Sequence, residues 1–173
     1  MNRIVLKKEI SGRILDIGGG GEGIVGRVYG PQVVAIDNRQ EELDEAPDGP
    51  EKVLMDAGKL AFGDGSFDNV TAFYFFLYLE AGLRMDVLRE AFRVLKPKGQ
   101  LYIWDAAIGT ADPVLVELDI DANGTSVHTA YGAVKDEAEQ DADSYIRLAE
   151  SVGFKTTGAE SKNGQFRLCF KKP

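Results

Sequence analysis

Three aspartates and a run of glycines are the residues best suited to chemistry in the first third of the chain. Asp16, Asp37 and Asp56 each follow an apolar run, and residues 18–21 are consecutive glycines. Glycine permits positive φ and lets the backbone approach a ligand with no Cβ in the way. Aspartate carboxylates can accept hydrogen bonds from ribose hydroxyls and amino groups. This set predicts a site for a ligand that contains a nucleoside.

Buried parallel strands would position these carboxylates. Residues 13–17, 33–37 and 53–56 are short runs of aliphatic and β-branched residues that each contain or end in aspartate, as expected of strands covered on both faces. The carboxyl ends of strands in an open α/β sheet line one crevice, so the three aspartates should converge there. Residues 24–28 predict a short helix that begins at this crevice. The alternative is that each aspartate merely begins a turn.

The glycines by themselves are ambiguous. Gly18, Gly20 and Gly23 also match the G-x-G-x-x-G spacing of dinucleotide-binding folds, which makes an NAD-dependent oxidoreductase one hypothesis. A flexible loop that binds nothing is another interpretation. Dinucleotide folds, however, rarely place an acid at the position of Asp16.

Together with later motifs, this pattern resembles the class I S-adenosylmethionine-dependent methyltransferases, of the small-molecule type. The resemblance is continuous over roughly residues 12–106 and looser beyond. Five motifs carry it: Ile-Leu-Asp-Ile-Gly-Gly-Gly at residues 14–20, Asp37, the pair Asp56-Ala57, the strand entry at residues 66–70 and the run Glu-Ala-Phe-Arg-Val-Leu-Lys-Pro-Lys-Gly-Gln-Leu at residues 90–101.

The resemblance implies a doubly wound α/β fold with a mostly parallel seven-stranded sheet whose last strand is antiparallel. We expect a single domain over residues 1–173, with a β-hairpin inserted after strand five at about residues 114–131. Alternating apolar residues on both sides of Asn123-Gly124 predict that hairpin. Its register would place Asp119 opposite His128, and this pairing competes with a catalytic role for His128.

The resemblance also implies a cofactor, S-adenosylmethionine, and a role for each matching residue. Asp16 would orient the amino group of the methionyl moiety, while Gly18, Gly19 and Gly20 would pass beneath that moiety. The backbone carbonyl of Phe73 would contact the same end of the cofactor.

The adenosine end is expected to contact residues after the second and third strands. Asp37 would accept hydrogen bonds from both ribose hydroxyls, with Asn38 beside it among the cofactor-binding residues. Asp56 would accept from the adenine amino group, and the backbone N–H of Ala57 would meet a ring nitrogen.

Two positions depart from the family pattern. Glu22 stands where the family often has glycine, so the glycine loop could be one residue wider. Leu77 and Tyr78 occupy the place where many small-molecule members carry histidine, which puts an acid/base role at that place in doubt.

Tyr74 and Tyr78 are the candidates for chemistry on the acceptor. They lie in an aromatic run at residues 73–78 that could wall an acceptor pocket and contact a sulfonium methyl group by cation–π attraction. Core packing is the alternative interpretation of this run. The leading hypothesis is a methyltransferase acting on a small-molecule acceptor. The alternative is a protein that binds S-adenosylmethionine or S-adenosylhomocysteine without catalysis.

Composition limits the partners and the location. The net charge is −8, which disfavours nucleic acid because affinity for nucleic acid rests on neutralising phosphates. The one cysteine, Cys169, allows no intrachain disulfide. No metal-ligand cluster or long apolar N-terminal run is seen, so we expect a cytoplasmic protein without metal or membrane contact.

Only about a dozen residues precede the first predicted strand, whereas many family members carry helices there that close over the cofactor. We therefore expect the hairpin at residues 114–131 to serve as a cap on the site or as the contact of a homodimer.

Overall fold

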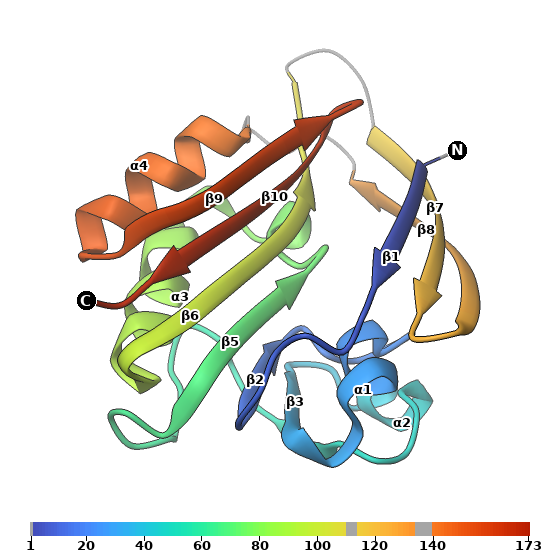
Figure 1. Cartoon of the computed structure of the whole chain (residues 1–173), viewed down its shortest axis with the longest axis horizontal. Helices are drawn as coiled ribbons and strands as arrows, with labels where there is room; N and C mark the ends of the chain where they lie inside the picture. The colour runs from blue at the N-terminus through green and yellow to red at the C-terminus, as the bar shows by residue number, and fades with distance from the viewer. Residues whose placement is uncertain (1, 110–113, 134–139) are drawn as a thin grey trace.

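The computed structural model describes residues 2–109, 114–133 and 140–173. Its main sheet has seven strands in the order β4-β3-β2-β5-β6-β10-β9 (Figure 1). In that order the strands are β4 (Glu51–Leu54), β3 (Val33–Asp37), β2 (Ile14–Ile17), β5 (Phe67–Phe73), β6 (Leu95–Ala106), β10 (Gln165–Lys171) and β9 (Lys155–Lys162). Neighbours from β4 to β6 are parallel, and β10 is antiparallel to both β6 and β9. The predicted doubly wound sheet with an antiparallel last strand is confirmed.

Helices lie on both faces of this sheet. The helices are α1 (Ile24–Tyr29), α2 (Gln40–Glu45), α3 (Ala81–Val94) and α4 (Ala142–Val152), with 3₁₀ turns η1 (Gly30–Gln32) and η2 (Phe76–Tyr78). α3 and α4 lie together on one side of the sheet (Figure 1) and bury a continuous apolar core that includes Leu15, Leu88 and Tyr145. Burial of this core is the main stabilising term of the fold.

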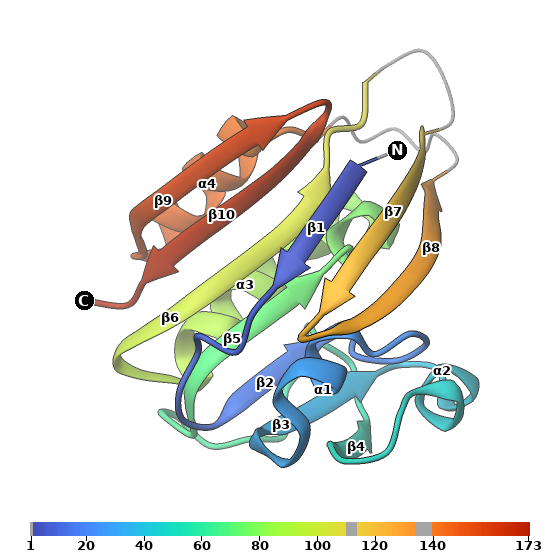
Figure 2. The same cartoon turned by 45° about the vertical axis from the view of Figure 1, so that its right-hand side comes forward.

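A second, three-stranded sheet lies over the opposite face, together with α1 (Figure 2). We call it the cap sheet: β1 (Asn2–Leu6), β7 (Val114–Ala122) and β8 (Thr125–Ala133), in the order β1-β7-β8. β7 and β8 form the predicted hairpin, with Asn123-Gly124 at its turn and Asp119 opposite His128. Nδ1 of His128 lies 2.9 Å from Oδ1 of Asp119, so the only histidine of the chain forms the cross-strand pair.

Strand β1 was not predicted. The residues before position 13 predict no strand, yet Asn2–Leu6 pairs in parallel with β7 from Asn2↔Leu118 to Leu6↔Ala122. Five residues carry little periodic signal, and the partner strand lies more than a hundred positions away. The segment forms a strand because it pairs with the edge of β7 in the hairpin.

The predicted third strand was placed too late in the sequence. β4 spans Glu51–Leu54, not residues 53–56, because its pairing with β3 ends at Asp37↔Leu54. The backbone N–H of Met55 still donates to the carbonyl of Asp37 at 2.9 Å. Asp56 then accepts from the N–H of Gly58 at 2.8 Å, so Asp56 begins a turn directly after β4.

Candidate cofactor-binding site

Asp16 lies at the base of the site, within β2. Its side chain is 2% exposed, and its Oδ1 accepts a hydrogen bond of 2.7 Å from Oγ1 of Thr71 on the neighbouring strand β5. Burial raises the pKa of Asp16 to about 7, which the Thr71 bond partly offsets and the negative charge of Asp37 reinforces. A cationic group placed against a buried carboxyl with this pKa stabilises the ionised form of the carboxyl.

The glycine loop passes between two carboxylates. The backbone N–H groups of Gly18 and Gly19 donate to the carbonyl of Ile36 at 2.9 and 3.0 Å, which fixes the loop to the end of β3. A Cβ on Gly19 would lie 2.7 Å from Oδ2 of Asp16, and one on Gly20 would lie 2.9 Å from Oδ2 of Asp37. Side chains at these positions would collide with the two acids, so the loop must be glycine for the backbone to run this close.

The residues expected at the adenosine end follow β3 and β4. Asp37, the last residue of β3, is half-buried, and its Oδ1 accepts from the N–H of Arg39 at 3.0 Å. Asn38 and Asp56 are exposed, while Ala57 is half-buried. Because β3 and β4 are adjacent and parallel, Asp37 and the turn at Asp56 lie at the same edge of the sheet as Asp16.

Phe73 and Tyr74 stand at the end of β5, the strand beside Asp16. Phe73 is 7% exposed and Tyr74 is 2% exposed. Tyr74 has a φ of 50°, and its N–H donates to the carbonyl of Trp104 at 2.7 Å. Its ring stacks on Tyr131 of the cap sheet, with ring centres 4.7 Å apart. Burial raises the pKa values of Tyr74 and Tyr131, so both hydroxyls stay protonated.

Tyr78 lies at the surface. Its side chain is 60% exposed at the end of η2, and its hydroxyl oxygen accepts from the N–H of Gly132 on β8 at 3.3 Å. Tyr78 and Tyr74 therefore both contact β8, but one is open to solvent and the other is enclosed.

The cap sheet also holds the glycine loop. Oγ1 of Thr129 on β8 donates to Oε1 of Glu22, the residue that departs from the family pattern. Thr129 and Tyr131 were not identified from the sequence as site residues. Their hairpin was predicted, but no local signal indicates which of its residues reach a loop a hundred positions earlier.

Asp105 is a further buried acid that the sequence analysis did not select. It is 0% exposed, and its Oδ1 accepts from the N–H of Ala106 at 2.8 Å and from Nε2 of Gln140 at 3.0 Å. Oδ2 accepts from the N–H of Leu77 at 3.3 Å. Burial raises the pKa of Asp105 to about 7. The sequence does contain a signal for Asp105, because this residue follows an apolar run typical of a strand, as Asp16, Asp37 and Asp56 do.

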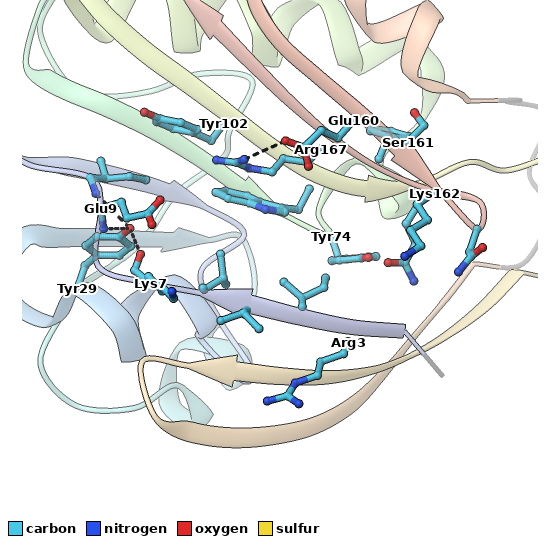
Figure 3. Close-up of a pocket in the computed structure, with 18 residues that line it drawn as sticks. Arg3, Lys7, Glu9, Tyr29, Tyr74, Tyr102, Glu160, Ser161, Lys162 and Arg167 are labelled. Atoms are coloured by element: carbon cyan, nitrogen blue, oxygen red, sulfur yellow. Dashed lines mark hydrogen bonds and ion pairs between the residues drawn. The ribbon is translucent and has the colours of Figure 1, made fainter.

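A cavity of about 1230 Å³ opens away from the glycine loop, between β1 and strands β6 and β10 (Figure 3). Tyr74 is the one predicted site residue that lines it. The strand-end acids do not line this cavity, so the two are separate features. Tyr74, at the end of β5, is the predicted site residue that they have in common.

The described part of the chain shows two further properties. None of its helices is long and apolar enough to cross a membrane. Within the same residues, no group of three or more histidine, cysteine, aspartate or glutamate side chains could hold a metal ion.

The residues present fit S-adenosylmethionine. Asp16 offers a buried carboxyl for the methionyl amino group, and Gly19 and Gly20 leave open backbone between that carboxyl and Asp37. Asp37 is positioned for the ribose, as in ligand sites at the carboxyl ends of parallel strands.

Comparisons with known proteins agree with this geometry. Residues 15–103 match the methyltransferase domain family. A protein from Pyrococcus horikoshii has a similar structure, with a TM-score of 0.68 and 19% identity over 96% of this chain and 85% of that one. A putative methyltransferase from Bacillus halodurans has a TM-score of 0.67 and 18% identity over 95% of each chain.

A third similar structure is a putative methyltransferase from Haloferax volcanii, solved in complex with the Trm112 methyltransferase activator. Its TM-score is 0.69 and its identity 15%, over 95% of this chain and 84% of that one. No curated protein sequence matches the chain. The chain therefore belongs to the methyltransferase domain family, with the class I fold whose cofactor is S-adenosylmethionine.

Proposed function

We propose that the protein transfers a methyl group from S-adenosylmethionine to a small-molecule acceptor. The observation that carries the proposal is the glycine loop, which passes so close to the carboxylates of Asp16 and Asp37 that a Cβ at Gly19 or Gly20 would lie less than 3.0 Å from one of them. The match to the methyltransferase domain family over residues 15–103 supports it.

In this proposal the residues have separate roles. Asp16 and the loop of Gly18, Gly19 and Gly20 hold the methionyl end, with the carbonyl of Phe73 beside it. The ribose and the adenine are held by the residues after β3 and β4, namely Asp37, Asn38, Asp56 and Ala57.

The bound cofactor supplies a sulfonium-activated methyl group, whose carbon accepts a lone pair from the acceptor while its bond to sulfur breaks and the pair stays on sulfur. The chain's contribution is then alignment and exclusion of water. Tyr74 and Tyr131 suit that task, because both are protonated, packed rings beside the end of β5.

We further propose that the cap sheet acts as the cap of the same chain's site. The hydrogen bond from Thr129 to Glu22 and the stacking of Tyr131 on Tyr74 support a cap over a dimer contact. Combining Thr129→Val with Tyr131→Ala, which leaves the buried residues of β7 in place, should weaken cofactor binding while leaving the mass of the protein particle in solution unchanged. A change of mass with unchanged binding would favour the homodimer.

Calorimetric titration with S-adenosylmethionine, S-adenosylhomocysteine and NAD tests the cofactor. We expect micromolar binding of the first two and none of NAD, whereas NAD binding would favour an oxidoreductase. Release of S-adenosylhomocysteine with a panel of acceptors then separates an enzyme from a protein that only binds the cofactor.

A further inference from the structure

A groove beside the cap sheet is left unused by the proposed function. Its volume is about 1230 Å³, somewhat above the roughly 300–1,000 Å³ typical of small-molecule sites. One wall is β1, which among the described residues pairs with β7 alone. Tyr102 and Trp104 of β6 line the floor, with ring centres 6.0 Å apart and nearly parallel planes. Tyr102 is half-buried, whereas Trp104 is buried and has the guanidinium carbon of Arg167 5.6 Å from its ring centre. Such a floor suits a flat aromatic ligand.

The groove is basic although the chain carries a net charge of −8. Four cationic side chains line it against two acidic ones: Arg3, Lys7, Lys162 and Arg167 against Glu9 and Glu160. Arg167 is paired with Glu160 at 3.5 Å and Arg3 with Asp121 of β7 at 3.9 Å. No ion pair of Lys7 or Lys162 is found in the described part of the chain. An acidic ligand therefore complements this groove.

One end of the groove reaches the predicted methyl-transfer end of the site. Tyr74 and Lys162 lie at that end, close to the start of β1, whereas Tyr29 and Glu9 lie at the other (Figure 3). Tyr74 directly follows Phe73, the residue expected beside the methionyl moiety. An anionic group held by Lys162 would thus point its ligand toward the end of β5.

Three acids of this part of the molecule are already engaged. Asp105 accepts hydrogen bonds from Ala106, Gln140 and Leu77. Glu22 accepts from Thr129, and Glu160, which lines the groove, is paired with Arg167. An alcohol acceptor must lose a proton to a base. A carboxylate acceptor carries its lone pair at neutral pH and needs no base.

We propose that this groove binds the methyl acceptor, and that the acceptor is an aromatic carboxylate that becomes a methyl ester; this rests on the proposed function. A carboxylate oxygen forms the new bond to the methyl carbon. The bond from that carbon to sulfur breaks, its electron pair stays on sulfur, and no proton moves. Lys162 holds the carboxylate, and the half-buried ring of Tyr102 packs against the ring of the acceptor, with Trp104 directly beside it.

Three probes with the same ring test the proposal: indole-3-acetate, tryptamine and indole-3-ethanol. Trp104 is the only tryptophan, so its indole N–H gives one identifiable signal in the NMR spectrum of the ¹⁵N-labelled protein. Indole-3-acetate should shift that signal at submillimolar concentration, and the amine and the alcohol should not. Lys162→Glu should weaken the response about tenfold, the loss of one charged hydrogen bond. Lys155→Glu, an exposed site outside the groove, should not.

With S-adenosylmethionine added, indole-3-acetate should yield a base-labile methyl ester. Equal shifts by all three probes, or no shift below 5 mM (about −3 kcal/mol of binding), would overturn the groove assignment. Binding without ester formation, or faster methylation of the amine or alcohol, would overturn the acceptor class. Calorimetry with S-adenosylmethionine alone reports on the proposed function separately, because it does not depend on the groove.

Discussion

The cofactor edge and the cap sheet bound the same site but are built in opposite ways. The cofactor edge comes from one stretch, residues 14–57, and presents acids and glycines at the ends of parallel strands. The cap sheet joins Asn2–Leu6 to a hairpin more than a hundred residues later, and it contributes apolar burial and single side-chain contacts. The residues proposed for the cofactor are thus local in sequence apart from Phe73, whereas the proposed enclosure of the site depends on tertiary assembly.

The largest expected effect tests whether the cap sheet is integral to the fold. Leu118 of β7 is 0% exposed, and Leu115 on the same strand is 68% exposed. Leu118→Ala should lower the free energy of unfolding by roughly 2–5 kcal/mol, in a single transition measured by denaturant titration. Leu115→Ala should change it by less than about 0.5 kcal/mol. A separate early transition for Leu118→Ala would show a cap that folds independently.

Gly20→Ala tests whether the glycine loop at the cofactor edge binds S-adenosylmethionine. The new Cβ would lie 2.5 Å from Cβ of Glu42 and 2.9 Å from Oδ2 of Asp37. Overpacking of this kind costs about 1–3 kcal/mol, so binding of S-adenosylmethionine should weaken by up to about a hundredfold in calorimetry. Gly82→Ala is the control, since nothing lies within 4 Å of its added Cβ. Equal affinities for the two variants would place the ligand elsewhere.

Asp16 should make cofactor binding depend on pH. Its pKa of about 7 means that the free protein carries a proton there below pH 7. A cationic methionyl amino group favours the carboxylate, so binding releases that proton and the affinity falls up to about tenfold per pH unit below 7. Calorimetry at pH 6 in two buffers of different ionisation enthalpy counts the released protons. Asp16→Asn should release none, and wild-type protein that also released none would contradict this role.

The smallest expected effect concerns the contact between the cap sheet and the glycine loop. Thr129→Val removes the hydrogen bond from β8 to Glu22, which is worth about 1 kcal/mol. The free energy of unfolding should fall by up to about 1 kcal/mol, and affinity for S-adenosylmethionine by up to about fivefold. Thr125→Val, at the exposed hairpin turn, is the matched control. If both variants bind like wild type, the cap does not order the glycine loop.

The predictable part of the molecule was the part with local signals. Apolar runs that contain or end in aspartate indicated β2 and β3, and Asn123-Gly124 fixed the hairpin register that places Asp119 against His128. The end of β4 was misplaced because the sequence does not show where pairing with β3 stops. The roles assigned to the strand-end acids stay predictions.

The parts that could not be predicted depend on contacts across the chain. β1 is too short to stand out without β7, and Tyr131 becomes a site residue only because its ring stacks on Tyr74. Asp105 shared the strand-end pattern but lay beyond the well-matched motifs. Its burial depends on Gln140, which also bonds the carbonyl of Ala106 at 2.6 Å and accepts from the hydroxyl of Tyr145 at 2.8 Å.

The central claim is that carboxylates at adjacent strand ends bind one molecule of S-adenosylmethionine. Calorimetry on Asp37→Ala and Asp56→Ala, with the exposed α2 acid in Glu45→Ala as control, tests it most directly. Each charged hydrogen bond is worth about 1.5–3 kcal/mol, so the two site variants should bind at least about tenfold more weakly than wild type and the control equally well. Wild-type affinity in both site variants would contradict the claim.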